Sequence, residues 1–374
     1  MTDLIPVCEP LFIGNEKKYL LDAIETGWIS SAGKYIPAFE EAFAAYCGVK
    51  HGIAVCNGTV ALHLALTAMG IGKEDEVIMP DFTMIASAVA VCYTGAKPVF
   101  IDAEPNTWNI DPARIEDRIT KKTKAIMPVH IYGHPCDMEP INKIAQKYNL
   151  KIIEDAAEAH GAEYKGRKTG SLGDIAAFSF YANKNITTGE GGMVVTDNEE
   201  LAERCRYFKN MCFPLKGGRT YIHNDIGFNY RMSNLHAAIG LAQVEKADTY
   251  RARRIRNAGL YLEGLRGVNG IFLQPQLPES LNVYWMNGVL VDPKLYGRTR
   301  DELVDLLKKE GVDTRNFFVG MHRQPSMKKY GCDVSEAYPV SENLQENGFL
   351  LPSGSNLTED QIRHICNSIL KFRK

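Results

Sequence analysis

The sequence predicts an α/β protein built on a mostly parallel sheet, and three observations point to this class. Through the first 235 residues, short continuous apolar segments alternate with helical patterns, as do strands that are buried on both faces of a sheet. Beyond about residue 235 the alternation gives way to a long helical stretch and a few mixed elements. The length of 374 residues leaves room for two domains. We therefore expect a large α/β domain over residues 1–245 and a small α+β domain over residues 246–374, against which the N-terminal segment can pack.

The elements of the large domain follow from apolar runs and from helix boundary residues such as Gly27, Gly48 and Gly70. The expected strands are Gly52–Cys56, Glu76–Met79, Lys97–Asp102, Lys124–His130, Lys151–Glu154, Ile175–Phe180 and Met193–Thr196. The expected helices are Asn15–Thr26, a helix around Phe39–Tyr46, Thr59–Met69 and Asp137–Asn149.

The second part of the chain begins with a helical stretch from Asn234 to about Leu265. Its charged run Arg251–Arg256 is interpreted as a solvated helix face. A strand at Tyr284–Val291, a helix with a capping box at Thr299 and Glu302, a strand near Asp313–Phe318 and a last helix with a box at Thr358 and Gln361 complete the expected small domain.

Composition excludes several classes of protein. With 43 basic and 45 acidic residues, the net charge of −2 argues against a nucleic-acid-binding surface. The longest uncharged apolar stretch, Ile85–Tyr93, is too short to span a bilayer, and Met1–Glu9 lacks the basic start of a secretory signal. The nine cysteines are odd in number and include no C-x-x-C pair, which indicates buried thiols in a reducing compartment. We expect a cytoplasmic protein with no metal site and no nucleic-acid or membrane partner.

Three segments that follow predicted strands carry side chains suited to chemistry, and open α/β sheets bind ligands at the carboxyl ends of their strands. Asn57-Gly58-Thr59 opens a helix, where N–H groups and the helix dipole favour an anion such as phosphate. Asp155 ends a strand. Taken alone, each of these two is more simply explained as a helix cap. Lys184 follows a buried strand and precedes three glycines, and a lysine held in a pocket can lose its proton and act as a nucleophile. The alternative is a loop lysine in a glycine-rich hairpin.

An anion cradle, an acid and a reactive amine on neighbouring strand ends are what pyridoxal phosphate (PLP) requires. PLP needs a phosphate site, an amine with which to form a Schiff base, and a carboxylate that keeps its ring nitrogen protonated. The protonated ring is the electron sink for the reaction.

The order of these motifs resembles that of the sugar aminotransferases of the DegT/DnrJ/EryC1/StrS family, within the fold-type I (aspartate aminotransferase) class. The resemblance covers essentially the whole chain, and its stretches are Trp28–Ser31, Asn57–Ala65, Glu154–Glu158, Ser179–Gly192 and Gly227–Ser233. Within the family, the runs Lys184–Met193 and Ala237–Gln243 are most similar to those of GDP-perosamine synthases.

The resemblance implies roles around the PLP ring. Lys184 would bind PLP covalently and then act as the general base for a 1,3-proton shift. Asp155 would pair with the pyridinium nitrogen, and Glu158 would approach the ring hydroxyl. Met84 stands where family members usually place an aromatic ring over the cofactor, and its thioether can cover the ring through a sulfur–aromatic contact.

The resemblance also implies a phosphate site shared between two subunits. Gly58, Thr59 and Ser179 would hold the phosphate, and Asn229 would reach the phosphate of the neighbouring subunit in a homodimer. Ser179 as a buried strand serine and Asn229 as a turn residue after Gly227 are the simpler alternatives.

The expected activity is transfer of the amino group of L-glutamate to a 4-keto-6-deoxy nucleotide sugar, GDP-linked as for perosamine, in the biosynthesis of surface polysaccharide such as lipopolysaccharide O-antigen. Residues 219–225 and 315–325 depart from the perosamine synthase pattern. Another acceptor therefore stays open: a different keto-sugar, a keto-inositol or a small phosphorylated ketone. Arg219 and His322, in these two segments, are the candidate substrate contacts, with solvated loop residues as the alternative.

Three other functions are weighed against this one. A PLP-family dehydratase would carry histidine in place of Lys184. A PLP-holding regulatory protein has no appended DNA-binding or coiled-coil segment to support it. A nicotinamide-dependent oxidoreductase would need G-x-G-x-x-G after the first strand, and the nearest phosphate-loop pattern, Gly161–Thr169, is interpreted as a hairpin turn.

Overall fold

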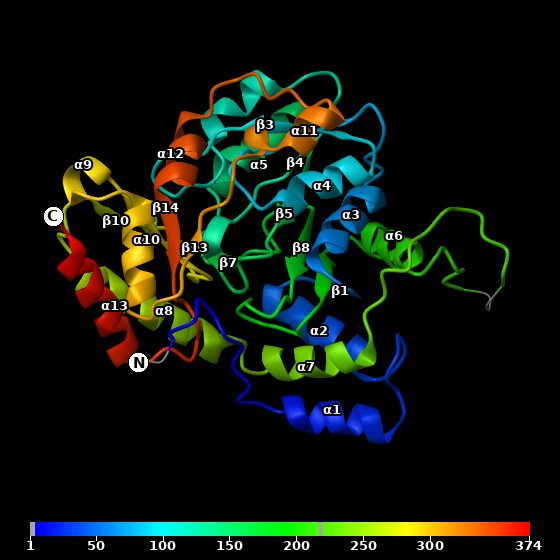
Figure 1. The fold of residues 1–374 in the computed structure, drawn as a ribbon. Helices are drawn as coiled ribbons and strands as arrows, with labels where there is room; N and C mark the ends of the chain where they lie inside the picture. The colour runs from blue at the N-terminus through cyan, green and yellow to red at the C-terminus, as the bar shows by residue number, and fades with distance from the viewer. Residues whose placement is uncertain (1–3, 217–219) are drawn as a thin grey trace.

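The computed structural model describes residues 4–216 and 220–374, which form a large sheet covered by helices and a smaller sheet beside it (Figure 1). The strands are β1 (His51–Val55), β2 (Glu76–Pro80), β3 (Lys97–Ile101), β4 (Thr123–Ile126), β5 (Lys151–Asp155), β6 (Glu163–Tyr164), β7 (Arg167–Lys168), β8 (Ile175–Ser179), β9 (Gly192–Thr196), β10 (Ile271–Leu273), β11 (Ser280–Leu281), β12 (Asn287–Val291), β13 (Arg315–Asn316) and β14 (Gly348–Leu351). The α-helices are α1 (Glu16–Glu25), α2 (Tyr35–Cys47), α3 (Gly58–Ala68), α4 (Ile85–Tyr93), α5 (Met138–Tyr148), α6 (Glu199–Lys209), α7 (Asn234–Val244), α8 (Ala247–Gly264), α9 (Pro293–Tyr296), α10 (Arg300–Lys309), α11 (Pro325–Tyr330), α12 (Pro339–Asn347) and α13 (Glu359–Phe372).

The large sheet has the strand order β1-β9-β8-β5-β4-β2-β3. The pairs β8·β5, β5·β4, β4·β2 and β2·β3 are parallel, whereas β9 runs antiparallel to both of its neighbours. This arrangement confirms the predicted α/β class with a mostly parallel sheet. The carboxyl ends of β1, β2, β4, β5 and β8 consequently lie along one edge of the sheet.

Alternation along the buried strands explains how both faces of the large sheet are covered. Ile153 and Val194 pack with α3 and α4 on one face, while Ile152 packs with α5, and Val195 packs with α2 and α7, on the other. Successive side chains of a strand point to opposite faces, so a strand covered on both sides is apolar throughout. Helix α7 lies between α2 and α1 (Figure 1).

The small domain is a four-stranded antiparallel sheet of order β10-β12-β14-β13 packed against α8, α10 and α13. Both predicted capping boxes, Thr299 with Glu302 and Thr358 with Gln361, are present at the starts of α10 and α13. The N-terminal segment joins this domain, because Ile5 pairs with Val312 and is buried in its core. The division at residues 245 and 246 stays a prediction.

Four expected elements differ from the structure. The helix expected over residues 234–265 is two helices, α7 and α8, because Lys246 leaves the helical conformation (φ −115°) and redirects the chain from α1 and α2 towards α13. Strand β4 ends at Ile126, because Pro128 has no N–H to donate to the ladder. Strand β12 begins at Asn287 rather than Tyr284, whose φ of +46° turns the chain. The strand near Asp313–Phe318 is reduced to Arg315–Asn316.

The hairpin expected after β5 is present. The segment Gly161–Thr169 forms the antiparallel hairpin of β6 and β7. In the ranges 4–216 and 220–374, no helix has the length and apolar character needed to cross a membrane.

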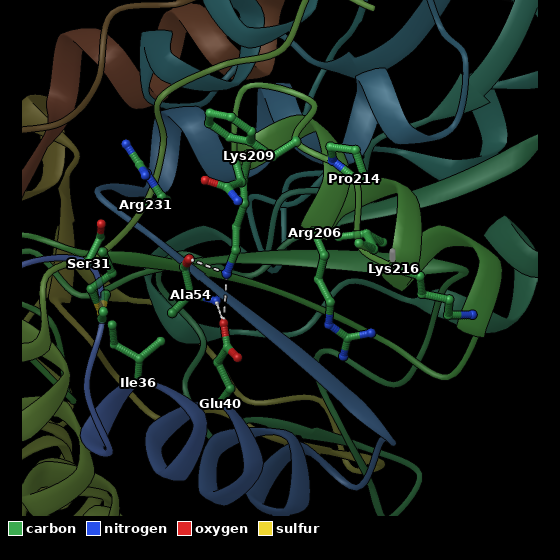
Figure 2. A pocket seen from close by; sticks show the side chains of 14 residues that line it. Ser31, Ile36, Glu40, Ala54, Arg206, Lys209, Pro214, Lys216 and Arg231 are labelled. Carbon is green, nitrogen blue, oxygen red and sulfur yellow. Dashed lines mark hydrogen bonds and ion pairs between the residues drawn. The ribbon is translucent and has the colours of Figure 1, made fainter. Parts of the chain in front are cut away.

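The edge strand β1 has free backbone groups that side chains satisfy. The N–H of Ala54 donates to Oε1 of Glu40 at 2.7 Å, and its carbonyl accepts from Nζ of Lys209 at 3.1 Å (Figure 2). Lys209 and Glu40 also form an ion pair at 2.8 Å. These charged side chains block the edge against pairing with another strand. They line a cavity of about 670 Å³ that also holds Arg206 and Arg231.

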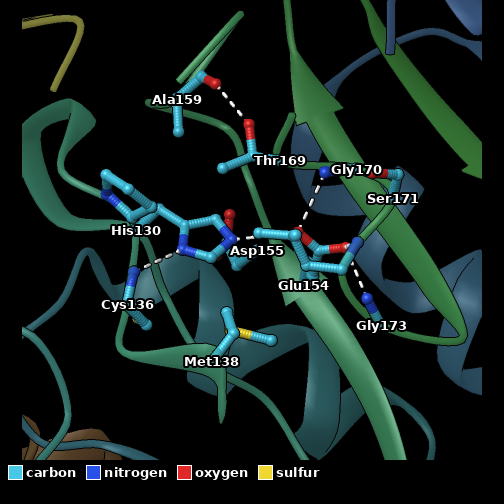
Figure 3. A network of polar contacts seen from close by, with 12 residues as sticks. His130, Cys136, Met138, Glu154, Asp155, Ala159, Thr169, Gly170, Ser171 and Gly173 are labelled. Carbon is cyan, nitrogen blue, oxygen red and sulfur yellow. Dashed lines mark hydrogen bonds and ion pairs between the residues drawn. The ribbon is translucent and has the colours of Figure 1, made fainter. Parts of the chain in front are cut away.

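The carboxyl end of β5 is fixed by a buried network around Glu154 (Figure 3). Oε1 of Glu154 accepts from the N–H groups of Leu172 and Gly173 at 2.7 and 2.8 Å, and Oε2 accepts from the N–H of Gly170 at 2.9 Å. Nε2 of His130 lies 3.1 Å from Oε2, while Nδ1 accepts from the N–H of Cys136. The proton of this neutral ring is thereby placed on Nε2, which donates to Glu154.

The network also fixes the residue that follows Glu154. The backbone N–H of His130 donates to the carbonyl of Asp155 at 3.2 Å, and the N–H of Asp155 donates to the carbonyl of Pro128 at 2.9 Å. The carboxylate of Glu154 and the backbone of His130 therefore hold the end of β5 from two sides.

Replacement of Glu154 by Gln tests this anchor. Each carboxylate oxygen of Glu154 accepts hydrogen bonds from two N–H groups. In the Gln variant the NH₂ group takes the position of one of these oxygens, so it faces two donors and leaves both without an acceptor. We expect the free energy of unfolding to fall by about 2–4 kcal/mol, measured by chemical denaturation at fixed PLP concentration. The control Glu263→Gln, at an exposed position on α8, should change it by less than about 0.5 kcal/mol. Equal stabilities of the two variants would contradict the assigned role.

Candidate active site

A cavity of about 630 Å³ opens where five strands of the large sheet end. Its lining includes Gly58 after β1, Met84 after β2, Val129 after β4, Asp155 at the end of β5 and Ser179 at the end of β8. The volume lies in the range typical of sites for small molecules and cofactors. The edge of the sheet predicted to carry chemistry therefore has a cavity of suitable size.

Lys184 enters this cavity from the turn after β8. Its Nζ lies 3.5 Å from the centroid of the Trp285 ring, a cation–π distance when the amine is protonated. Burial lowers the pKa of the amine, while the carboxylates of Glu158 and Asp155 oppose this change. In the part of the chain that the structure describes, no group accepts a hydrogen bond from Nζ, so the amine is available to react.

Asp155 supplies the acid of the site. Its Oδ2 accepts a hydrogen bond from Oγ of Ser87 at 2.7 Å, and its Oδ1 accepts one from the N–H of Ala157 at 3.2 Å. Oγ1 of Thr83 lies 3.1 Å from the Ser87 hydroxyl and extends the network. Burial raises the pKa of Asp155, and the two hydrogen bonds oppose this effect. A cationic ring nitrogen beside the carboxylate would hold it in its ionised form.

Glu158 is a second buried carboxyl group in the cavity. It accepts a hydrogen bond from the N–H of Tyr132 at 2.7 Å. Burial raises its pKa to about 7, although the nearby Lys184 acts in the opposite direction. Near neutral pH, Glu158 can thus either accept or donate a hydrogen bond to a ligand hydroxyl.

The start of helix α3 forms a cradle with the end of β8. Asn57 caps the helix by accepting from the N–H of Val60 at 3.0 Å, so the cap is Asn57 and not Thr59. A Cβ at Gly58 would lie 2.6 Å from Cβ of Ser179, so a larger residue would close the space between helix and strand. With Thr59 and Ser179 lining the same cavity, this helix terminus suits a phosphate.

The residues brought together fit PLP. An amine that donates no hydrogen bond to any described residue, a buried carboxylate and an anion cradle face one cavity, as PLP requires. Met84 also lines the cavity; its side chain is 46% exposed, and its Sδ accepts from the N–H of Ala86 at 3.0 Å.

Three predicted site residues lie elsewhere. Asn229 is exposed and its amide oxygen accepts from Arg231 at 2.7 and 3.0 Å, outside the lining of this cavity.

The side chain of His322 is 8% exposed and its Nδ1 lies 2.8 Å from Oδ2 of Asp81. Burial lowers the pKa of His322, but Asp81 and Glu342 outweigh it and raise the pKa. The ring of His322 is held against Asp81, which follows β2, and does not line the cavity. Arg219 lies outside the described residues.

Sequence reasoning missed three residues of the site. Ser87 lies in a run of small apolar residues that gave no polar signal. Trp285 falls within the expected strand Tyr284–Val291, but the turn at Tyr284 brings its ring to Lys184. Arg254 belongs to the run interpreted as a solvated face, and that interpretation is wrong for it, because its side chain is 1% exposed. The other three arginines of the run, Arg251, Arg253 and Arg256, are at least partly exposed.

The cavity at the edge of β1 is a separate one. None of the residues predicted to hold PLP lines it, although Arg231, the hydrogen-bond partner of Asn229, does (Figure 2). With the exception of Asn229, the residues predicted to hold PLP line the smaller, more apolar cavity at the strand ends.

Comparison with known proteins agrees with this geometry. The profile of the DegT/DnrJ/EryC1/StrS aminotransferase family matches residues 12–370. The chain is 47% identical to a GDP-perosamine synthase of Caulobacter vibrioides over 99% of both proteins, and 44% identical to that of Escherichia coli O157:H7 over 98% of both. The solved structure of DesV from S. venezuelae superposes with a TM-score of 0.89 at 34% identity, covering 97% of this chain and 98% of that one. The chain therefore belongs to the DegT/DnrJ/EryC1/StrS aminotransferase family and is a PLP-dependent transaminase.

Proposed function

We propose that this transaminase moves the amino group of L-glutamate to the keto group of a 4-keto-6-deoxy nucleotide sugar, GDP-linked as in perosamine formation, for surface polysaccharide biosynthesis. The observation that carries the chemistry is the buried Lys184 amine beside Asp155 and Glu158 at the strand ends. The acceptor is supported by the names of relatives that match nearly the whole chain at 40–47% identity.

Several residues of the cavity have a task in this reaction. PLP, when bound, supplies the electron sink that stabilises negative charge on the reacting carbon. Lys184 would hold the cofactor through Nζ and would take up and return a proton at that atom, which its lowered pKa favours. Asp155, fixed by Ser87, would keep the ring nitrogen protonated. Gly58, Thr59 and Ser179 would hold the phosphate.

Trapping of the cofactor tests the assignment of Lys184. Reduction of the PLP-loaded protein with borohydride should add the mass of the reduced cofactor to the peptide that contains Lys184. Lys184→Ala should lose this adduct and reduce kcat by on the order of 10³-fold or more, because nucleophile and base are removed together. Lys168→Ala, a change outside the cavity, is the control. An adduct on a different lysine would overturn the assignment.

A panel of amino acceptors tests the proposed substrate. With glutamate as donor, kcat/KM should be at least about tenfold higher for a GDP-linked 4-keto-6-deoxy sugar than for its dTDP-linked counterpart. Contacts with the matching base are kept in the transition state as well as in the ground state, so they raise kcat/KM for that nucleotide. Amine transfer is followed by mass spectrometry of the product. Preference for a keto-inositol or a small phosphorylated ketone would favour the alternative acceptor, for which the unusual residues 219–225 and 315–325 are the motivation.

We further propose a homodimer in which Asn229 of the partner subunit completes the phosphate site. Asn229 is exposed in the single chain and directed by Arg231. Large apolar side chains are exposed as well, among them Trp28 and Ile226, which is 92% exposed. Exposed apolar groups of this size are typical of surfaces that bind another protein.

Complementation between two inactive chains tests the shared site. In a heterodimer of Lys184→Ala and Asn229→Asp chains, one site combines an intact Lys184 with the intact Asn229 of the partner subunit. We expect about half of the wild-type activity per heterodimer, while each parent homodimer stays far below it. The Asp carboxylate repels the phosphate, which explains the loss in the Asn229→Asp parent. Purified heterodimers no more active than their parents would argue against a shared site.

We propose a cytoplasmic location, as expected from the sequence. All nine cysteines are free and six of them are buried, which supports a protein that works in a reducing compartment.

A further inference from the structure

Arg254 on helix α8 carries a guanidinium group that is buried without a carboxylate. Its Nε donates to Oγ of Ser355 at 3.0 Å and its Nη1 donates to the carbonyl of Trp285 at 2.7 Å. Its Nη2 lies 3.3 Å from Sγ of Cys8 and 3.5 Å from the carbonyl of Asn183. None of these partners is a carboxylate, and no ion pair of Arg254 occurs within residues 4–216 and 220–374. An unneutralised charge in the interior is costly, so its presence calls for a functional reason.

The groups that Arg254 holds are those that place Lys184. The carbonyl of Asn183, the residue before the lysine, also accepts from Nε1 of Trp285 at 2.9 Å and from Sγ of Cys8 at 3.3 Å. The ring of Trp285 lies 3.5 Å from Nζ of Lys184. Of the four contacts of Arg254, the shortest is to the Trp285 backbone, so its main effect is to fix the ring against which the amine packs.

We propose that Arg254 is a positioning residue for Lys184, which fixes the Trp285 backbone and the Asn183 carbonyl and places a guanidinium without a carboxylate beside the segment that carries the amine. The inference rests on the PLP-dependent activity and is independent of which sugar accepts the amine.

The charges that surround Lys184 explain why such a group is useful. Burial lowers the pKa of its amine, while the carboxylates of Glu158 and Asp155 and the thiol of Cys8 raise it. Arg254 acts in the same direction as burial and lowers the pKa, with a smaller effect. His160, packed nearby, is neutral because burial lowers its pKa to about 3. Without Arg254, two carboxylates would face the amine with only burial to oppose them, and the protonated, unreactive form would become more populated.

Two substitutions separate charge from geometry. Arg254→Met removes the charge and keeps the length of the side chain, whereas Arg254→Lys keeps the charge but replaces the planar fork by one ammonium, which cannot reach both Ser355 and Trp285. Arg253→Met is the control, since Arg253 is the neighbouring residue with the same charge and makes no hydrogen bond or ion pair with any described residue.

The measurement is the second-order rate constant for PLP capture by cofactor-free protein, followed by absorbance as a function of pH. For wild type and Arg253→Met, we expect the same profile. For Arg254→Met, the midpoint of the rise should move up by about one pH unit, and the rate at neutral pH should fall about tenfold, because one pKa unit is a tenfold change in reactive amine. For Arg254→Lys, the midpoint should stay, while the rate falls several-fold at every pH.

The outcomes decide between the parts of the inference. An Arg254→Met profile identical to that of wild type overturns the role of the charge, and an Arg254→Lys rate equal to that of wild type overturns the positioning role. Circular dichroism and thermal melting show whether each variant folds. If Arg254→Met does not fold, the midpoint of the pH profile and the rate of PLP capture measured for Arg254→Lys decide whether the inference stands. If the expected profiles are found but no GDP-linked sugar is aminated, the acceptor proposal fails and the inference on Arg254 is supported.

Discussion

The burial of one primary amine beside two carboxylates is the constraint on which the site depends. Water would keep the Lys184 amine protonated, whereas burial lowers its pKa and Glu158 and Asp155 raise it again. Burial is the larger of these opposing effects, so the pKa of the amine is lowered overall. The same burial raises the pKa of both carboxyl groups, that of Glu158 to about 7. The three groups therefore set one another's charge, and a cofactor that carries charges of its own completes the balance.

The fold holds these groups at fixed positions through strand ends rather than through flexible loops. Asp155 is the last residue of β5, and the Glu154 network behind it satisfies every acceptor site with backbone N–H groups and His130. Ser87, on α4, then orients the Asp155 carboxylate through one short hydrogen bond. Each of these contacts joins segments far apart in the sequence, so the geometry exists only once the large sheet is assembled. Such pre-formed polar groups in a buried site are effective in catalysis because they need no reorganisation during the reaction.

The sequence was sufficient to predict what depends on local pattern. Buried strands, helix caps and the parallel sheet follow from periodicity. The residues predicted to hold the cofactor, Gly58, Asp155, Lys184 and Ser179, lie at or just after strand ends and line one cavity, where ligands of such sheets bind. Ser87, Trp285 and Arg254 could not be found in this way, because their roles come from contacts with residues 68, 102 and 71 positions away. Arg254 also shows the limit of reading charge from composition: a run of arginines gives no sign of which member is buried, since burial is decided by the neighbouring segments.

The state of the lysine is coupled to the docking of the small domain. Arg254 on α8, Ser355 after β14 and Trp285 before β12 all belong to the second half of the chain, while Lys184 and Asn183 belong to the large domain. The N-terminal segment adds Cys8 to the same cluster and pairs with the small domain at Ile5. The ring against which the amine packs and the positive charge near it are consequently contributed by elements other than the sheet that carries the lysine. The placement of the Lys184 amine therefore rests on contacts between elements from both halves of the chain as well as on the strand ends.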